Sequence, residues 1–422
     1  MTVAGEAHRA IDAVWRIESP RLIAGLVRMT HDVGAAEELA QDALVAALEQ
    51  WPESGVPGNP GAWLMAVAKR RAIDQFRRQE RFERKVEELG RDLDTREVPE
   101  PEPDDIGDDL LRLVFTACHP VLSTDARVAL TLRLLGGLTT DEIARAFLAP
   151  EPTVAQRIVR AKRTLAKKKV PFEVPQGEEL AGRLSSVLEV VYLIFNEGYS
   201  ATAGDDWMRP ELCAEALRLG RVLARLAPRE PEVHGLVGLM EIQQSRTNAR
   251  TSRSGEPILL LDQDRGRWDQ LLIRRGLAAL EQAESLTDSR GPYTLQAAIA
   301  ACHARARTAA ATDWDRITAL YGELAAVTSS PVVELNRAVA LAMAEGPAAG
   351  LAVVDELTEE PALEHYHLLP SVRGDFLVKL GRHAEARREF ERAASLTRNE
   401  RERSLLRERA EQAAAAVGFS PG

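Results

Sequence analysis

The chain has 422 residues, which is too long for one ordinary hydrophobic core and predicts two or three domains. Aromatic residues make up only 5% of it, and alternating runs of β-branched residues bounded by turns are scarce, so we expect an all-α protein. A net charge of −10 would argue against nucleic-acid binding if the charges were evenly spread, but they are strongly segregated along the chain.

The first module, residues 1–85, contains two amphipathic helices separated by a loop rich in glycine and proline, residues 54–61. The helix over residues 32–51, DVGAAEELAQDALVAALEQW, has one apolar stripe and one polar face. The stripe consists of Ala36, Leu39, Ala40, Ala43, Leu44, Ala47 and Leu48. The polar face carries Glu37, Glu38, Gln41 and Asp42, and we expect it to meet a partner.

The helix that follows the loop, residues 59–85, combines an apolar face with many cations. We expect Trp63, Leu64, Val67, Ala68, Ile73 and Phe76 to point inward. The cations are Lys69, Arg70, Arg71, Arg77, Arg78, Arg81, Arg84 and Lys85. Such a helix can follow a phosphate backbone, with an affinity that falls as salt rises.

Residues 86–109 hold eleven acidic residues against two arginines, with three interleaved prolines. A segment of this composition repels itself and cannot bury a core, so it predicts an extended, flexible linker. Because it lies between two cationic helices, we hypothesise that it competes with DNA for them.

The second module, residues 110–172, contains a helix-turn-helix pattern. Thr139 and Glu142 form a capping box that starts a short helix, and a turn with Pro150 and Pro152 precedes a second helix. Val154, Ile158, Ala161 and Leu165 should point inward, opposite Gln156, Arg157, Arg160, Lys162, Arg163, Lys167, Lys168 and Lys169. A basic second helix after a tight turn can enter the major groove. The alternative is a solvated basic helix on an ordinary bundle.

Three motifs resemble the sigma-70 family, in its small extracytoplasmic-function type: DVGAAEELAQDAL, PGAWLMAVAKRRAIDQFRR and LTTDEIARAFLAPEPTVAQRIVRAKRTL. They cover most of residues 20–170 in the family's order. The resemblance identifies the two modules as the family's conserved regions 2 and 4, joined by a short linker. It implies a subunit of bacterial RNA polymerase that recognises promoters.

The resemblance also implies a role for individual residues. It implies that Glu37, Glu38, Gln41 and Asp42 bind core polymerase. It implies that Asn59, Trp63, Lys69, Arg70, Arg77 and Arg78 contact the −10 element, where a loop can hold an unstacked base and cations can hold a melted strand. It implies that Thr153, Gln156, Arg157, Arg160, Lys162 and Arg163 read the −35 element. Lys69 and Arg70 stand where the family often has an asparagine, and Pro150 and Pro152 are unusual in the recognition turn.

The remainder, residues 173–422, is predicted to be a tetratricopeptide-like helical-repeat domain that regulates the protein. Residues 368–399 match such a repeat best, with Gly374, Ala386, Phe390 and Ala393 at its expected positions and Gly381 in the turn. Weaker repeats run through Ala216, Leu223, Pro228 and Gly238 and through residues 335–357. The alternative is a helical domain without repeats. LIFNEGYSAT (residues 193–202) and LLLDQDRGRWD (residues 259–269) resemble signature segments of a sigma-factor subgroup with a long C-terminal extension.

The chain shows no pattern of a catalytic or metal site. It lacks GxxxxGK[ST], GxGxxG and HExxH, and its cysteines, Cys118, Cys213 and Cys302, form no CxxC pair. No apolar run approaches the roughly 20 residues that span a membrane, and the start lacks the regions of a signal peptide. We therefore expect a cytoplasmic, non-enzymatic factor without metal or cofactor and with no membrane contact.

The expected partners are core RNA polymerase, promoter DNA (duplex at −35 and melted at −10) and a protein on the C-terminal repeat surface. One alternative is a helix-turn-helix regulator that acts on duplex DNA without polymerase. Another is a repeat scaffold or enzyme whose first half is vestigial.

Overall fold

The computed structural model describes residues 3–87, 105–147, 149–200, 203–204, 208–252 and 258–417. Its contacts divide the chain into two compact units, Met1–Leu193 and Ile194–Gly422. Apart from helices, these residues form only two short strands, β1 (Ala203–Gly204) and β2 (Arg398–Asn399), which pair in parallel. The prediction of an all-α protein is confirmed. Among the same residues, no helix is both long and apolar enough to cross a membrane.

The first unit consists of helices, two of which start at a side-chain cap. Asp32 accepts a hydrogen bond from the Ala35 amide at 2.8 Å, and Asn59 accepts one from the Ala62 amide at 3.1 Å, satisfying amides that have no partner within the helix. The helices are α1 (Val3–Thr30), α2 (Val33–Ser54), α3 (Pro60–Glu87), α4 (Asp105–Ala117), α5 (Thr124–Leu134), α6 (Thr140–Ala146), α7 (Glu151–Lys167) and the greater part of α8 (Glu178–Tyr199).

The predicted apolar faces of α2 and α3 have different outcomes. In α2 the stripe is confirmed, since Ala36, Leu39, Ala40, Ala43 and Ala47 are buried and Leu44 and Leu48 are half-buried. In α3 the buried positions are Leu64, Ala68 and Ala72, while Trp63 and Val67 are half-buried. The inward placement of Ile73 is wrong, because its side chain is 40% exposed, one position past the four-residue spacing of the buried row. The side chain of Phe76 lies outside the described residues.

Most of the predicted acidic linker, residues 88–104, lies outside the described residues. Its last five residues, 105–109, form the beginning of α4. There Asp109 is buried and pairs with Arg28 of α1 at 3.3 Å and with Arg112 at 2.8 Å. The helix therefore begins earlier than the composition indicates, because Asp109 has cations to pair with once the chain is folded.

The first part of α8 is tied to the second module. Arg183 donates to the carbonyl of Phe115 at 2.9 Å, and Ser186 donates to the carbonyl of Cys118 at 2.6 Å. Arg127 of α5 also contacts Ser186 and pairs with Glu189 at 3.0 Å. These contacts satisfy the carbonyl groups at the end of α4, which have no partner within that helix.

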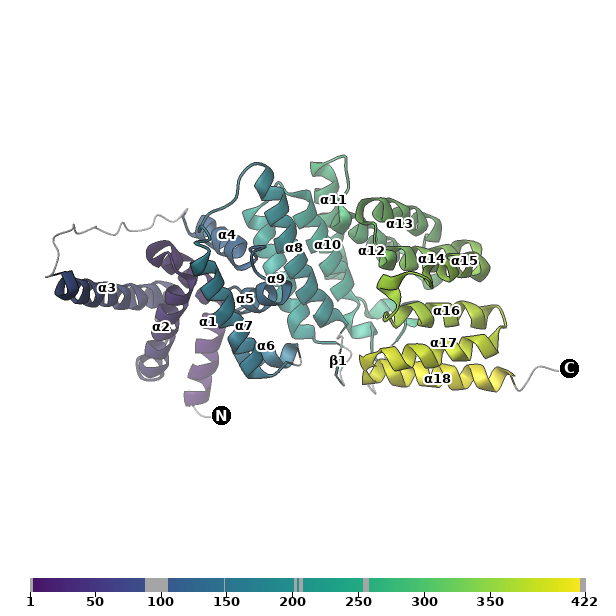
Figure 1. Ribbon diagram of the computed structural model, residues 1–422, viewed down its shortest axis with the longest axis horizontal. Helices are drawn as coiled ribbons and strands as arrows, with labels where there is room; N and C mark the ends of the chain where they lie inside the picture. The colour runs from purple at the N-terminus through teal and green to yellow at the C-terminus, as the bar shows by residue number, and fades with distance from the viewer. Residues whose placement is uncertain are drawn as a thin grey trace. The chain divides into compact units, whose positions relative to one another are not determined.

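The second unit consists of successive antiparallel helices (Figure 1). Five of them start with proline, which has no amide to satisfy and a φ angle already suited to a helix. The helices are α9 (Pro210–Leu226), α10 (Pro231–Ser245), α11 (Gln270–Leu286), α12 (Pro292–Arg305), α13 (Trp314–Thr328), α14 (Pro331–Glu345), α15 (Pro347–Leu357), α16 (Leu368–Lys379), α17 (His383–Leu396) and α18 (Glu400–Val417).

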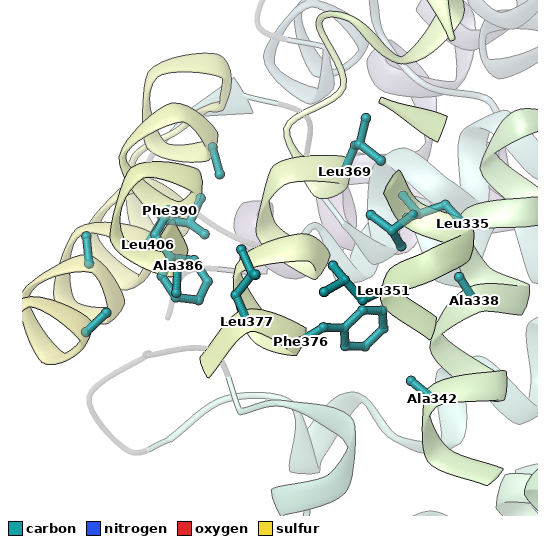
Figure 2. Close-up of a cluster of buried hydrophobic side chains, with 14 of the residues drawn as sticks. Leu335, Ala338, Ala342, Leu351, Leu369, Phe376, Leu377, Ala386, Phe390 and Leu406 are labelled. Atoms are coloured by element: carbon teal, nitrogen blue, oxygen red, sulfur yellow. The ribbon is translucent and has the colours of Figure 1, made fainter. Parts of the chain in front are cut away.

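The strongest predicted repeat forms a helical hairpin, α16 and α17, with its residues in the expected places. Ala386, Phe390 and Ala393 are buried, and a Cβ atom added at Gly374 would lie 2.7 Å from the Phe390 ring. Gly381, in the turn, has a φ of +74°, which favours glycine. Figure 2 shows this apolar core continuing from Leu335 through Phe376 to Leu406, so each hairpin buries its face on its neighbours.

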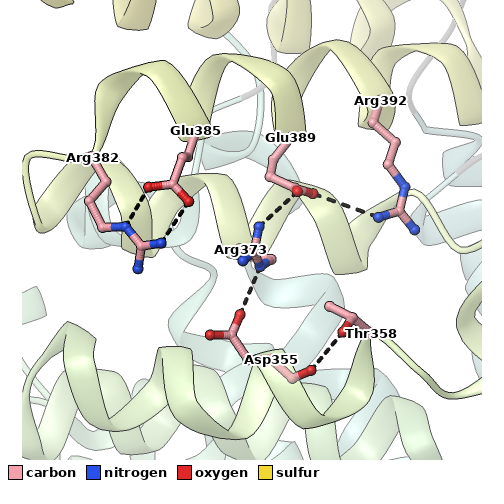
Figure 3. A network of polar contacts seen from close by, with 7 residues as sticks. All are labelled: Asp355, Thr358, Arg373, Arg382, Glu385, Glu389 and Arg392. Atoms are coloured by element: carbon pink, nitrogen blue, oxygen red, sulfur yellow. Dashed lines mark hydrogen bonds and ion pairs between the residues drawn. The ribbon is translucent and has the colours of Figure 1, made fainter.

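An arginine joins three helices of this stack at the surface (Figure 3). Arg373 of α16 donates to Asp355 of α15 and to Glu389 of α17, both at 2.8 Å. Burial opposes the charge of Arg373, but the bonds and charges of these two carboxylates raise its pKa above the usual value. By contrast, Arg382 and Glu385 form a pair within one turn of α17 and its cap.

Candidate functional site

The helix-turn-helix pattern of the second module is confirmed in its local contacts. Thr139 and Glu142 form the predicted capping box: the Thr139 amide donates to the Glu142 carboxylate at 2.8 Å, and the Glu142 amide donates to the Thr139 hydroxyl at 3.1 Å. In α7, which starts at Glu151 with Pro152 in its first turn, the predicted inward residues Val154, Ile158, Ala161 and Leu165 are all buried. The opposite face of α7 is therefore left for other contacts.

Four of the six residues assigned to −35 recognition lie together on α7. Thr153, Gln156, Arg160 and Arg163 are exposed, and their spacing of three and four residues puts them on one helix face. The other two are partly covered. Arg157 pairs with Asp125 at 3.0 Å, and Lys162 points toward α2, where it bonds to Glu37 at 2.7 Å.

The residues assigned to −10 recognition follow α3 from its cap onward. Asn59 is exposed even though it caps the helix, and Trp63 packs edge-on against Trp51 with ring centroids 5.2 Å apart. Arg70 and Arg77 are exposed and Lys69 is half-buried, while the side chain of Arg78 lies outside the described residues. The exposed Ile73 lies three residues after Arg70 and four before Arg77, so it is on the same face as these cations.

The residues assigned to core polymerase binding separate into two pairs on α2. Glu38 and Asp42 are exposed, and Asp42 makes one solvent-facing contact with Arg71 of α3, at 3.3 Å. Glu37 is only 4% exposed, and Gln41 donates to its carboxylate at 2.8 Å. Half of the predicted polar face is therefore open to solvent.

The carboxylate of Glu37 is held by cations from the second module. Arg133 of α5 donates through Nε at 2.6 Å, and Lys162 of α7 donates through Nζ at 2.7 Å. Burial alone would raise the pKa of Glu37, but the charges and hydrogen bonds of Lys162 and Arg133 outweigh it and hold this pKa below its usual value. The carboxylate is therefore charged at neutral pH and forms a contact between the two modules.

Arg133 and Asp109 are contact residues that no motif in the sequence indicates. Arg133 lies 96 residues from Glu37, and Asp109 pairs with the distant Arg28 as well as with Arg112, three residues away. No periodicity or local spacing could have paired Arg133 with Glu37 or Asp109 with Arg28.

In the second unit, the two signature segments meet around buried arginines. Arg246 contacts the Tyr199 hydroxyl, and its guanidinium carbon lies 5.7 Å from the Tyr199 ring centroid and 5.8 Å from that of Trp268. Arg250 lies 3.5 Å from the Tyr199 centroid and donates to the Tyr199 carbonyl. The two segments are thus joined by cation–π contacts.

The DQDR part of the second segment builds a corner of the fold. Arg265 donates to the carbonyls of His303 and Ala306 and to the Thr312 hydroxyl, and no carboxylate in the described part of the chain pairs with it. Asp264 and Asp269 cap the helices that follow them. The sequence of this segment is compatible with a buried ion-pair corner, a ligand contact or a polar loop anchored by Trp268. The contacts favour the loop, because Trp268 is buried.

His303 shares this corner. Burial lowers the pKa of His303 to about 4, with help from the nearby charges of Arg246 and Arg265. Its ring lies 5.2 Å from that of Trp314. The imidazole is therefore neutral at neutral pH.

Three family models match this chain. The model for sigma-70 region 2 matches residues 15–82, and the model for sigma-70, region 4 matches residues 112–165. A family of unknown function, DUF6596, matches residues 183–284, which include both signature segments.

Relatives of two kinds are similar to the chain. The uncharacterized protein R00370 of Rhizobium meliloti is 44% identical over 393 residues, which cover 92% of each chain. The ECF RNA polymerase sigma factor SigL of Mycobacterium tuberculosis is 31% identical over 141 residues, 33% of this chain and 77% of its own length. The ECF RNA polymerase sigma factor SigK of the same species is 29% identical over 168 residues, 39% of this chain and 87% of its own length.

Proposed function

The chain belongs to the sigma-70 family, as an extracytoplasmic-function (ECF) sigma factor with a long helical C-terminal extension, and from this premise we propose how its surfaces divide the work of initiation. It is a sigma factor that acts with core RNA polymerase on promoter DNA. The finer assignment is that α2 binds core polymerase, α3 holds the −10 element and α7 reads the −35 element. The protein catalyses no reaction of its own.

The assignment of α7 is supported by its exposed row of Thr153, Gln156, Arg160 and Arg163. Arginine and glutamine side chains can bond base edges in the major groove, and further cations hold phosphates. The buried opposite face keeps this row in one orientation, so the contacts can be specific.

The assignment of α3 is supported by a different combination of side chains. Trp63 and the exposed Ile73 are apolar, and the cations Lys69, Arg70 and Arg77 lie on the same helix. Aromatic surfaces stack on unpaired bases while cations follow the backbone, which suits a melted strand better than a duplex. This combination favours a sigma factor over a regulator that only binds duplex DNA.

Transcription in vitro with purified core polymerase tests the proposal. The full chain should direct transcripts from defined start sites, and Arg160→Ala should weaken promoter binding by about 1–3 kcal/mol. Arg387→Ala, which removes an exposed arginine of α17, is the matched control and should leave promoter binding unchanged.

Two outcomes would contradict the proposal. The absence of any promoter-dependent transcript from a genomic template would rule out a sigma factor. Binding of the free chain to specific duplex sites, with no affinity for core polymerase, would favour the helix-turn-helix regulator instead.

We assign regulation of this activity to the second unit, including a protein partner on its repeat surface. Support comes from the stacked hairpins, a type of surface that suits protein contacts. A chain shortened to residues 1–200 keeps α8 whole, and with it the contacts of Arg183 and Ser186. It should bind core polymerase yet transcribe at a different rate; an equal rate would argue against regulation.

A further inference from the structure

We propose that the first unit is held closed by an ionic lock, formed by Glu37, Arg133 and Lys162, which withholds the polymerase-binding helix from core polymerase until the lock opens. The inference rests on the proposed function, because it assumes that α2 is the polymerase-binding helix. It adds a gate to that function and assigns the gate to Arg133, a residue outside the predicted interfaces.

The geometry of the lock uses both oxygens of one carboxylate. Oε1 of Glu37 accepts from Arg133 at 2.6 Å and from Gln41 at 2.8 Å, and Oε2 accepts from Lys162 at 2.7 Å. Glu37 is 4% exposed, so a polymerase side chain cannot reach its carboxylate while the lock is formed. Both cations come from the second module, one from α5 and one from α7.

Two of the three residues have a second predicted partner. Glu37 is expected to bind core polymerase, and Lys162 is expected to contact DNA at the −35 element. While the lock is formed, Glu37 therefore cannot contact core polymerase and Lys162 cannot contact DNA. A pair between residues with no other partner would only stabilise the fold, whereas this pair competes with both ligands.

The lock can open because its cations are not deeply buried. The side chains of Arg133 and Lys162 are 22% and 19% exposed, so water can solvate them when they leave Glu37. Exposing both charges to water avoids the cost of leaving one of them buried without a partner. Core polymerase and DNA would supply new partners to the freed charges.

The effect of the lock on the affinity for core polymerase follows from the fractions of free chains that are locked and open. If only about a tenth of the free chains are open, the apparent affinity for core polymerase falls about tenfold. Breaking the lock restores that factor without any change in the polymerase-binding residues themselves.

The first experiment titrates core polymerase, without DNA, against full-length chains. Arg133→Gln should bind about tenfold more tightly than the wild type, and Lys162→Gln should also bind more tightly. Arg133→Lys, which keeps the charge, should stay close to the wild type. The matched control is Arg127→Gln, which removes an arginine of the same helix whose carboxylate partner, Glu189, is on α8.

The second experiment measures the lock directly in the free chain. Fluorescent labels are placed on engineered cysteines at two exposed positions, Val45 of α2 and Val159 of α7, with the half-buried Cys302 changed to serine. Energy transfer should report a short separation in the wild type and in Arg127→Gln, and a longer one in Arg133→Gln. Circular dichroism checks that each variant keeps its helix content.

The outcomes separate the lock from the proposed function. Equal core affinity in the wild type, Arg133→Gln and Arg127→Gln, with transcription intact, would overturn the lock alone. An unchanged label separation in Arg133→Gln would overturn it as well, whatever the affinities. Failure of all the chains to bind core polymerase would overturn the proposed function and the gate with it.

Discussion

Two clusters of charged side chains, one around Glu37 in the first unit and one around Trp268 in the second unit, are held in different ways. In the first unit, the buried Glu37 is bonded to Arg133 and Lys162, side chains of another module with expected partners elsewhere. In the second unit, Arg246 and Arg265 are held by aromatic rings and backbone carbonyls of their own unit.

This difference separates a contact that can be exchanged from one that cannot. A carboxylate and two cations can each be solvated or given to a new partner, so their contact can act as a gate. Carbonyls of a folded backbone have no such freedom, because leaving them unpaired in the interior is costly. Arg246 and Arg265 therefore hold the fold of the second unit together. We expect substitutions around them to lower its stability and not to change ligand binding directly.

The largest effect should come from removing the ring that supports these arginines. Trp268→Ala deletes a side chain that is 3% exposed and should reduce the free energy of unfolding of the second unit by about 3–5 kcal/mol. Hydrogen exchange followed peptide by peptide would measure this loss in α10 to α12. Leu271→Ala, at a position 48% exposed, is the control and should stay within about 0.5 kcal/mol. Faster hydrogen exchange in the first unit, with no change in α10 to α12, would contradict the assignment of Trp268 to the stability of the second unit.

Mild acid should weaken the corner of the second unit that holds His303. His303 has a pKa of about 4 in the folded chain against an ordinary 6.5, so the unfolded chain binds the extra proton between these values and stability falls as pH drops. From pH 7 to pH 5 the second unit should lose about 2 kcal/mol, measured by chemical denaturation. His303→Gln should abolish the dependence, and its persistence in that variant would assign it to other groups.

The contact of Glu37 should survive that change and fail only in stronger acid. Because its pKa is lowered, the stability that it contributes is present above the ordinary value of 4.5 and is lost as pH falls through the lowered pKa. The groups that face its carboxylate are Arg133, Lys162 and Gln41. Energy transfer between the labels on α2 and α7 should therefore report a longer separation once the pH falls below the lowered pKa of Glu37.

Glu37→Gln is the matched control for this acid step. In this variant the ionic lock should already be open at pH 7, so the distance between the labels should not increase further in acid. A step of the same size in both chains would mean that other carboxylates cause it.

The smallest effect concerns the surface network of the repeats. Arg373→Ala removes bonds to Asp355 and Glu389 and should reduce the free energy of unfolding by about 1 kcal/mol, since its side chain is partly screened by water. Thermal unfolding would measure it. Arg382→Ala, whose bonds to Glu385 remain within one turn, should leave the midpoint unchanged. An equal loss of stability in both variants would mean that the bonds of Arg373 between three helices stabilise the fold no more than a pair within one turn.

Much of the fold and of the candidate site could be predicted because it depends on neighbours in the chain. The Thr139–Glu142 capping box, the α2 stripe from Ala36 to Ala47 and the buried row of α7 all follow from spacings of three or four residues. The conserved-region assignment followed in the same way, from motifs in a set order. Even there, periodicity was not sufficient for Ile73, whose exposure depends on which turn of α3 meets its neighbours.

The sequence by itself determined the helices, the repeat hairpin and the clustering of cations on one face of α3 and of α7, because helix formation, capping and amphipathic patterning act over a few residues. Only the tertiary structure decided which charges meet. Glu37 finds its partners 96 and 125 residues away, and Arg265 finds carbonyls about 40 residues away. Such pairs depend on burial and orientation in the packed chain, which no local spacing records.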